Sequence, residues 1–491
     1  MRKGVSIMFF SLLLLSCSSD NEEKDALKSK ISSQKDAVAF LSNQDALIAF
    51  GAIQMDLLLK KIITDSKLGA SGLIPRNMID DYIDCIDTKS PIYYAVRDSK
   101  QSNGIPDIIV FGKIIDADAL INTIKLDAPF LKLEKEGEVQ YLVEGELKIG
   151  INDQYFVALI NGQESKKNSK RKLNTILKEL NGKGQNKVID DVLSNAKDFT
   201  FAFNSAELSK FSAETIGTPI LQINDKLNTL AAMHLSFEKG AIKIVAESHP
   251  SEEIESWNLF KKDSKPLLPT LGSGSPVGAF AINMNVDEYE RLQKAYFPLG
   301  MANSIKESGL EKELLNYIPD NLAVIEALIK KEGITSFING EFGAAIYADD
   351  GIHSEYSLHL GIGPSLRPML ADELDYYKNI FYKFDLDDKK LAIYSSENNG
   401  PQSQETPLTI PKQFSSFGTY PMSGFMDLER IPSDDMIPDY AEPFMELLSN
   451  CIFNASMKEG SIVLNMKNKE INSLTQICNQ IPKLIMGSIL Q

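Results

Sequence analysis

Short strand-like runs that lead directly into helix-like segments recur along this chain. Residues 199–203 read FTFAF and are followed by NSAELSKF, and residues 277–282 read VGAFAI and are followed by NMNVDEYERLQKAY. Residues 108–115 lead in the same way into DADALINTIK, where Asp116 has the position and chemistry of an N-cap. Apolar residues in the following segments have helical spacing. The chain is therefore expected to pack helices against strands.

Two more segments fit the same pattern. Residues 422–426 read MSGFM and precede DLERI, and residues 38–41 read VAFL and precede SNQDALIAFGAIQMDLLLKKI. The second segment has a Ser with an Asp three places later, which is typical of a capping box. We expect a strand at residues 38–41 and a helix after it.

Hairpin patterns lie between these strand-helix units. Residues 233–248 alternate on either side of Gly240, residues 453–467 alternate on either side of Gly460, and the two stretches align without gaps. Residues 138–160 and 342–363 supply further strands in hairpins. Hairpins break a strict βαβ order, so the sequence predicts an α+β fold of repeated strand-helix-hairpin units, with antiparallel sheets and helices packed on one face. Internal duplication and an ordinary α+β arrangement both remain open.

Polar stretches rich in Gly, Ser, Asn and Lys divide the chain. We expect a signal peptide at residues 1–16, a lipidated cysteine with a flexible tether at 17–35, an N-terminal α+β domain at 36–162, a basic linker or helix at 163–190, a middle α+β region at 191–271 and a C-terminal α+β region at 276–491. The length supports several domains, because single cores stop growing beyond about 250–300 residues.

The N-terminus has the parts of a secretory signal. Arg2 and Lys3 are basic, residues 7–15 are mostly apolar, and Ser16 precedes Cys17. The apolar run is too short to span a bilayer, which takes roughly 20 residues. The sequence LLSC resembles the lipobox of bacterial lipoproteins, in which the cysteine becomes the acylated N-terminus. Cys17 is thus the predicted lipidation site, with palmitate-type chains anchoring the protein in the membrane; an ordinary signal peptide with an incidental cysteine is the alternative.

Acidic residues follow the cysteine immediately. Asp20, Glu22 and Glu23 lie in the stretch SSDNEE, which resembles the export signal that sends Bacteroidota lipoproteins to the outer face of the outer membrane. We therefore expect an outer-membrane lipoprotein that faces the cell exterior, with an acidic linker facing the periplasm as the alternative.

The charge balance restricts the partners. The chain has 51 basic and 67 acidic residues and a formal net charge of −16. Nucleic acid requires a basic face, so it is not expected as a partner. Contact with the membrane is expected through the N-terminal lipid.

Three cysteines remain after Cys17. Cys85, Cys451 and Cys478 show no CxxC spacing. Cys451 and Cys478 are interpreted as buried small apolar residues, and a disulfide between these two is the other interpretation.

The usual catalytic and metal-binding signatures are missing from the sequence. It contains no HExxH, Walker-type glycine loop, GxGxxG or GxSxG. His353 and His359 are six residues apart, which suits strand positions better than a metal pair. The sequence predicts no catalytic residue, no metal ligand and no cofactor, and enzymatic activity stays open. Clustering of Asp349, Asp350 and the two histidines around a cavity would favour a hydrolase.

Several of these segments together resemble an uncharacterised family of Bacteroidota cell-envelope lipoproteins defined by a domain of unknown function. The resemblance is carried by the lipobox ending in Cys17 and by AVAFLSNQDALIAF, IIVFGKIIDADALINTIK, IGINDQYFVALING, FAFNSAELSKF and PMSGFMDLERI. It implies an envelope location and no assigned activity.

Three classes of function are therefore considered. The first is a non-catalytic binding or structural protein of the cell envelope, whose partner is an envelope protein or a polysaccharide. The second is an accessory lipoprotein for glycan or nutrient capture. The third is a hydrolase with an unrecognised active site.

Overall fold

Antiparallel strands dominate the structure, a computed structural model that describes residues 23–64, 66, 82–98, 106–144, 147–160, 165–216, 225–296, 331–347, 355–377, 383–395, 408–431 and 442–481. The chain forms two compact units. Unit 1 is Met1–Ser251 together with Asn468–Gln491, and unit 2 is Glu252–Lys467. The described residues contain eighteen strands as well as helices, and every strand pairing within a unit is antiparallel, which confirms a mixed, strand-rich fold with large antiparallel sheets.

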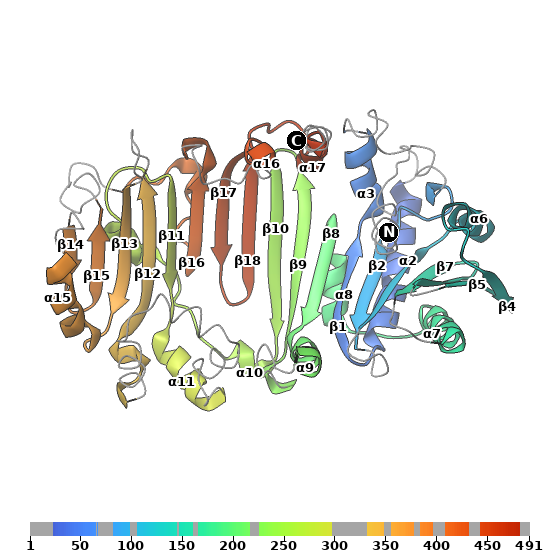
Figure 1. The fold of residues 1–491 in the computed structure, drawn as a ribbon, viewed down its shortest axis with the longest axis horizontal. Helices are drawn as coiled ribbons and strands as arrows, with labels where there is room; N and C mark the ends of the chain where they lie inside the picture. Colours follow the sequence, from blue (N-terminus) through green and yellow to red (C-terminus); the bar gives the residue numbers. More distant parts are fainter. Residues whose placement is uncertain are drawn as a thin grey trace. The chain divides into compact units, whose positions relative to one another are not determined.

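Ten strands of unit 1 pair in the order β4-β5-β6-β7-β3-β2-β1-β8-β9-β10 (Figure 1). Their bounds are β1 Leu47–Ile53, β2 Ile92–Arg97, β3 Asp107–Lys113, β4 Leu133–Glu136, β5 Val139–Glu144, β6 Leu147–Ile151, β7 Tyr155–Ile160, β8 Phe199–Asn204, β9 Thr229–Glu238 and β10 Ala241–Pro250. Strand β1 is central because it pairs with β2 on one side and with β8 on the other.

Helices connect these strands. They are α2 Glu23–Ser42, α3 Met55–Leu59, η1 Lys60–Thr64, α6 Ala117–Asp127, α7 Lys166–Glu179, α8 Lys187–Ser194, α9 Ser205–Ile216, η2 Asp225–Leu227 and, from the C-terminal segment, α17 Ser473–Cys478. Asp116 caps α6 by accepting a hydrogen bond from the backbone N–H of Ala119 at 2.9 Å, which confirms the predicted cap.

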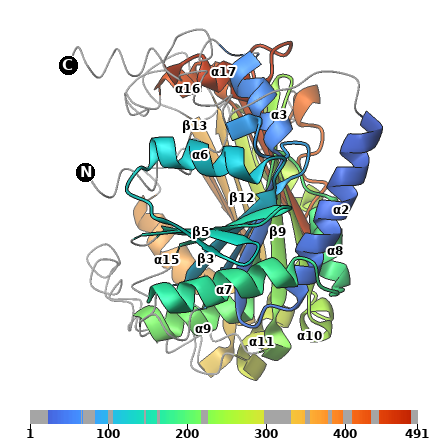
Figure 2. The same cartoon turned by 90° about the vertical axis from the view of Figure 1, so that its right-hand side faces the viewer.

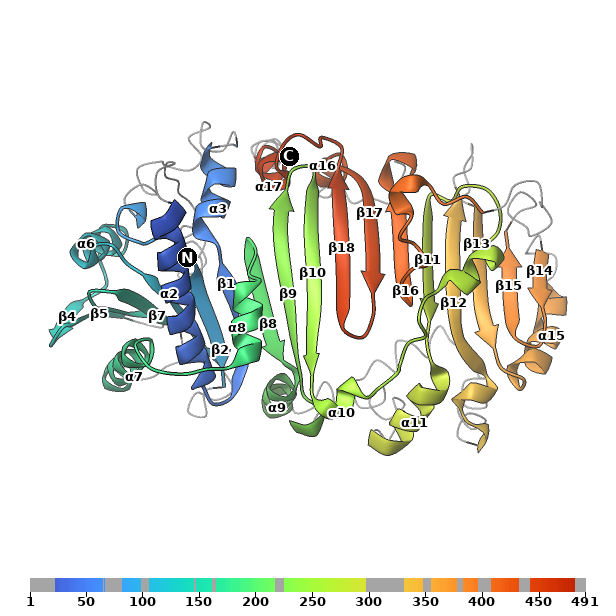
Figure 3. The ribbon, with the colours of Figure 1, turned by 180° about the vertical axis from the view of Figure 1, so that it is seen from behind.

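Helices pack on both faces of the unit 1 sheet. Phe111 of β3 lies in a buried cluster with residues of α2, α7 and α8, whereas its neighbour Val110 lies in a second cluster with residues of α3 and α6. Adjacent strand residues point to opposite faces. Figure 2 shows α6 and α7 on opposite sides of β5, and Figure 3 shows α2 and α8 side by side. The expected packing of helices on one face is thus not confirmed for unit 1.

Eight strands of unit 2 pair in the order β14-β15-β13-β12-β11-β16-β17-β18. Their bounds are β11 Gly278–Asn283, β12 Ile338–Tyr347, β13 Glu355–Ile362, β14 Lys383–Leu386, β15 Lys390–Tyr394, β16 Met422–Asp427, β17 Leu448–Ala455 and β18 Glu459–Met466. The helices are α10 Glu252–Glu255, η3 Lys265–Thr270, α11 Val286–Tyr296, η4 Ile334–Ser336, α15 Leu366–Tyr377, η6 Lys412–Phe414, η7 Leu428–Arg430 and α16 Glu442–Met445.

The two units repeat one scheme of strand pairing. In each, the first strand (β1 or β11) is central and pairs with the second strand and with a later one (β8 or β16) that continues into a final hairpin. The third strand (β3 or β13) is followed by a helix and by a hairpin whose second strand pairs back onto it. Unit 1 has two additional strands, β4 and β5, at the outer end of this scheme.

Hydrogen bonds at corresponding places match. A backbone N–H at the end of the central strand donates to the carbonyl of the residue before the later strand in both units: Gln54, directly after β1, to Asp198 at 3.1 Å, and Asn283, the last residue of β11, to Pro421 at 2.8 Å. The turn before β7 and the turn before β15 are built alike. The side chains of Asn152 and Asp387 each accept from the backbone N–H groups two and three residues on.

The strand-helix prediction is correct at three places, partly correct at a fourth and wrong at a fifth. Strands β3, β8 and β11 each lead into the expected helix, α6, α9 and α11. At the fourth, β16 leads only into the short 3-10 helix η7. The segment at residues 38–41 instead ends α2, and the following predicted helix begins with β1. Helix α2 also occupies residues 23–35, which were expected to be a flexible tether.

The predicted gap-free alignment of the two final hairpins holds for their first strands, β9 and β17, and fails at their turns. The pairings make Leu235 and Ala455 equivalent, which is the predicted alignment of β9 with β17. Gly240 forms the turn in unit 1, but Gly460 pairs with Ala455 inside β18. The unit 2 hairpin is therefore shorter than the sequence alignment predicts.

The basic run within 163–190 is a packed element. Ser165 caps α7, whose Leu173, Ile176 and Leu177 are buried. Lys170 forms ion pairs with Glu134 and Glu136. This run is a helix of unit 1 with a solvated basic side, and the expected domain boundaries on either side of it stay predictions.

Candidate functional site

The predicted lipidation and export-signal residues lie almost wholly outside the described residues. This holds for Cys17, Asp20 and Glu22, whereas Glu23 is the first residue of α2. No structural statement is therefore made about the lipidation site itself. The start of α2 does bear on the length of the linker.

The two cysteines proposed to pair are free thiols in different units. Cys451 is half-buried on β17 of unit 2, and Cys478 is buried on α17 of unit 1. Burial raises the pKa of both thiols, that of Cys478 to about 11. Both are therefore weakly nucleophilic at neutral pH, and a disulfide between them stays a prediction without support from the structure.

A chain of polar side chains crosses three strands of unit 1. Thr200 Oγ1 lies 3.1 Å from His234 Nδ1, and His234 Nε2 lies 3.3 Å from a carboxylate oxygen of Glu247. His249 Nε2 lies 3.3 Å from the same oxygen. This order of hydroxyl, imidazole and carboxylate has the chemistry of a nucleophile, a base and an orienting acid.

Burial opposes a catalytic role for this chain of residues. Thr200 is 0% exposed, and its hydroxyl already accepts a hydrogen bond from the backbone N–H of Lys197 at 3.1 Å. A substrate carbonyl cannot reach an atom that solvent does not reach. The equivalent positions in unit 2, Ser423 and Asn454, are also buried and include no imidazole. We interpret the unit 1 residues as a satisfied internal network.

Asp198 links three segments of unit 1. Its carboxylate pairs with Lys61 Nζ at 2.5 and 2.6 Å and accepts a hydrogen bond from the backbone N–H of Phe237 at 2.6 Å. The side chain of Asp198 is 3% exposed, so this is a nearly buried ion pair whose removal on one side leaves a buried charge. The Asp198 side chain, directly before β8, thus links η1 to β9.

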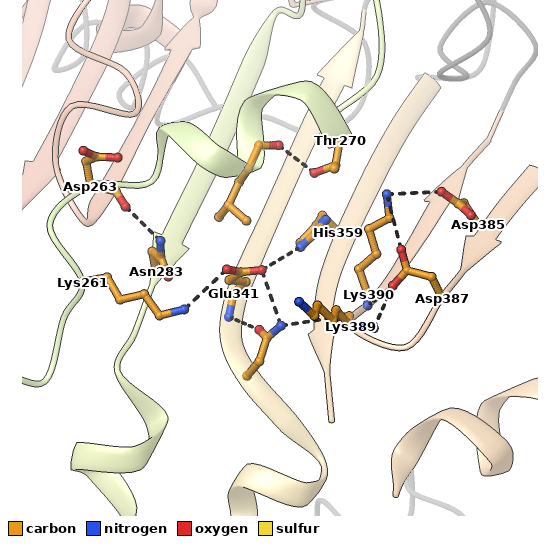
Figure 4. A network of polar contacts seen from close by, with 12 residues as sticks. Lys261, Asp263, Thr270, Asn283, Glu341, His359, Asp385, Asp387, Lys389 and Lys390 are labelled. Carbon is orange, nitrogen blue, oxygen red and sulfur yellow. Dashed lines mark hydrogen bonds and ion pairs between the residues drawn. The ribbon is translucent and has the colours of Figure 1, made fainter. Parts of the chain in front are cut away.

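The second polar network lies in unit 2, around His359 (Figure 4). His359 Nε2 is 3.8 Å from Glu341 Oε2, beyond hydrogen-bond distance, and Lys261 Nζ is 3.4 Å from Glu341 Oε1. Neither ring nitrogen of His359 has a hydrogen-bond partner. His359 and then Lys261 lower the pKa of the Glu341 carboxyl against the opposing effect of burial, so Glu341 is a carboxylate at neutral pH.

Comparison of the units explains why His359 is unusual. Strand pairing makes His359 the equivalent of Phe111: Phe111 lies between Tyr93 and Val157, and His359 lies between Gly343 and Ala392. Phe111 packs edge-on against Phe40 of α2 with ring centroids 5.1 Å apart. A polar ring thus occupies a position where unit 1 has a core aromatic ring.

Charges near His359 come from several strands. Asp385 of β14 forms an ion pair with Lys390 of β15 at 3.3 Å. Asp387 accepts hydrogen bonds from the N–H groups of Lys389 and Lys390, and these hold its pKa low although partial burial alone would raise it. Positive and negative groups alternate here, so the network favours neither an isolated cation nor an isolated anion.

The residues proposed for a hydrolase are only partly described. His353, Asp349 and Asp350 lie outside the described residues, and His359 is 2% exposed and contacts Glu341. Among the described residues, no group of three or more His, Cys, Asp or Glu side chains could hold a metal ion. Within the same part of the chain, no helix combines the length and the apolar character needed to cross a membrane.

Sequence reasoning missed both polar networks. It took His353 and His359 as strand residues in preference to a metal pair. His359 does lie in β13, but neither of its ring nitrogens has a hydrogen-bond partner, and His353 lies outside the described residues. The network partners Thr200 and Glu247 are far apart in sequence and meet only through strand pairing. A signal for His359 existed in the alignment of the two halves of the chain, where a core aromatic position becomes polar.

Comparisons with known proteins assign neither a family nor a function to the chain. No protein-family model matches the chain, and no curated protein matches it. Among solved structures, crystal forms III and IV of TP0453 are similar to this chain with a TM-score of 0.28 and 12% identity; they cover 44% and 43% of this chain and 80% and 79% of their own. Crystal form I has the same TM-score and 11% identity. At this TM-score the likeness carries no argument about function.

Proposed function

We propose that the protein is an outer-membrane lipoprotein, facing the cell exterior, with a non-catalytic binding or structural role in the cell envelope. The observation that carries the proposal is the sequence LLSC followed by SSDNEE, which combines a lipidation site at Cys17 with acidic residues at the start of the mature chain. The position of α2 supports it, because only five residues separate Cys17 from Glu23, where the folded body begins.

The non-catalytic part of the proposal has a separate support. The described arrangement with the chemistry of a nucleophile and base, at Thr200 and His234, is sealed from solvent. The equivalent residues of unit 2, Ser423 and Asn454, are also buried but include no imidazole. The two equivalent positions thus fit a packed polar interior better than turnover of a substrate.

We further propose that the two units arose by internal duplication of one strand-helix-hairpin scheme. The same order of pairing, the same hydrogen bond after the central strand and the same side-chain-capped turn support it. Independent origin would not reproduce these local details together. A binding protein built from two related units presents two related sheets to its partner.

The experiment that tests the proposal combines lipid labelling with protease shaving of intact cells. The native chain should incorporate labelled palmitate and be cleaved from the cell surface. Cys17→Ala should lose the label, and a chain with Asp20, Glu22 and Glu23 changed to Asn and Gln should keep the label and be protected from protease. A native chain that carries no acyl group would reject the proposal. Protection of a labelled native chain would move the protein to the periplasmic face.

A further inference from the structure

The linker between the proposed lipid and the folded body is short. Helix α2 begins at Glu23, six Cα steps after Cys17. An extended chain spans at most about 3.6 Å per residue, so these steps cover no more than about 22 Å. The start of α2 must therefore stay close to the bilayer surface.

The middle of α2 contacts the end of β3. Lys113, the last residue of β3, donates a hydrogen bond to Ser32 Oγ of α2 at 2.9 Å and lies 3.7 Å from a carboxylate oxygen of Asp36. Because α2 ends at Ser42, shortly before β1 begins at Leu47, its start points towards the end of the sheet where β1 finishes. Strands β1 and β3 both end here, and α3 and α6 follow them directly. Figure 3 shows α3, α6 and the first turns of α2 at the same end of unit 1, and Figure 2 shows α2 on the opposite side of the sheet from α3 and α6.

Exposed apolar side chains are concentrated on the elements at this end. Leu126 of α6 is 78% exposed, Ile115 before α6 is 66% exposed and Phe130 after it is 56% exposed. Leu57 on α3 and Ile31 on α2 are exposed as well. Large apolar side chains exposed to this degree mark an interaction surface when several occur together.

Helix α6 is apolar on two sides. Leu120, Ile121 and Ile124 are buried against the sheet, so the packing of unit 1 does not use Leu126. Lys132 is exposed beyond Phe130. Asp116, Asp118 and Asp127 are exposed on or beside the same helix, so the charged neighbours have both signs. Apolar side chains next to charged ones are found in segments at a membrane interface, where the apolar groups enter the acyl region and the charged groups stay at the headgroups.

We propose that this end of unit 1 rests on the bilayer that holds the Cys17 acyl chains, with Leu126 and Phe130 inserted at the interface. The inference rests on the proposed lipid anchor, because the short linker is what selects the bilayer as the occupant of this surface. The anchor keeps the surface at high local concentration over the membrane, so modest apolar contacts suffice to orient the molecule. The rest of the molecule is then presented in a fixed direction.

A single tryptophan moved between sites tests the proposal. The natural tryptophan is removed by Trp257→Phe, and the probe is introduced by Phe130→Trp or, as a matched control on another exposed apolar position of unit 1, by Met233→Trp. Each chain is purified with its acyl groups, verified by mass, and placed in vesicles of phosphatidylethanolamine and phosphatidylglycerol with brominated acyl chains. We expect at least about twofold quenching of the Phe130→Trp probe and none of the Met233→Trp probe.

The outcomes separate this inference from the proposed function. An acylated chain whose two probes are equally unquenched overturns the membrane contact and leaves the anchor intact, and a blue-shifted but unquenched probe at position 130 overturns it in favour of a protein partner. A chain without acyl groups overturns both.

Discussion

At the scale of single residues, Gly240 joins the C-terminal segment to unit 1. It has a φ of 64°, and a Cβ atom there would lie 2.5 Å from Cα of Lys469. Its N–H donates to the carbonyl of Ile471 at 3.0 Å, and the side chain of Asn472 donates to the carbonyl of Phe237 at 2.6 Å. The turn therefore needs glycine both for its conformation and for the close approach of another backbone segment.

Gly240→Ala is expected to destabilise unit 1 by more than the conformational cost of about 1–2 kcal/mol. Gly137→Ala is the matched control, because Gly137 has a φ of 62° and nothing within 4 Å of its would-be Cβ. Urea unfolding followed by circular dichroism measures both changes. Equal losses in the two variants would show that the contact with Lys469 contributes nothing.

Exchange of the equivalent residues Phe111 and His359 is expected to have opposite effects. His359→Phe removes two buried ring nitrogens without partners and should raise the free energy of unfolding by about 1–2 kcal/mol. Phe111→His places such nitrogens in a filled core and should lower it by about 3 kcal/mol. The measurement is denaturant unfolding of each variant. A large loss of stability in His359→Phe would instead show that the imidazole is held by a stabilising interaction, for example with Glu341.

At the scale of elements, α17 holds the C-terminal segment on unit 1. The hydroxyl of Thr475 donates to the carbonyl of Lys61 at 2.8 Å, and Cys478 is buried beside it on the same helix. Burial raises the pKa of the Cys478 thiol to about 11, above the usual 9.0. The unfolded chain therefore loses this proton at a lower pH than the folded chain does.

Stability should consequently fall as the pH rises from 9 to 11, and Cys478→Ala should remove part of that fall. The difference between native and variant should be at most about 2 kcal/mol. Urea unfolding at pH 8, 9, 10 and 11 measures it, and Cys451→Ala provides the comparison with a thiol of unit 2. Parallel pH curves for native protein and Cys478→Ala would contradict this prediction.

Much of the element order could be predicted from the sequence, and the failures have local causes. Asp116 and the alternation around Gly240 are strong signals because a cap and a turn each depend on one residue type. The prediction for residues 38–53 was wrong because β1 is buried on both faces and so has no alternating pattern. A short apolar run of this kind fits a helix and a strand equally well. The site could not be predicted, because His234 and Glu247, and likewise His359 and Glu341, meet only through pairing of strands.

At the scale of the whole molecule, unit 1 is discontinuous in sequence. Residues 252–467 form unit 2, and the chain then returns to unit 1 as α17 and the segment that pairs beside Lys239. Unit 1 thus depends on residues made after all of unit 2. The sole tryptophan, Trp257, belongs to unit 2 and reports on that unit alone.

Truncation after Lys467 should therefore destabilise unit 1 selectively. We expect part of the circular dichroism signal to be lost at a lower urea concentration, while the midpoint of the Trp257 fluorescence transition stays unchanged. Truncation after Ile481 keeps α17 and should behave like the full chain. A shift of both signals to the same lower midpoint would show that the units unfold together.

Under the proposed export to the cell envelope, the discontinuity of unit 1 sets an order of events. The first segment to leave the cytoplasm belongs to the unit that is completed last, and the inserted unit can finish folding while its host still waits for α17. Until then the edge around Lys239 and Gly240 lacks its closing segment. A chain stalled before residue 468 would consequently present an open unit 1 to proteases, so that degradation would act as a check on complete synthesis.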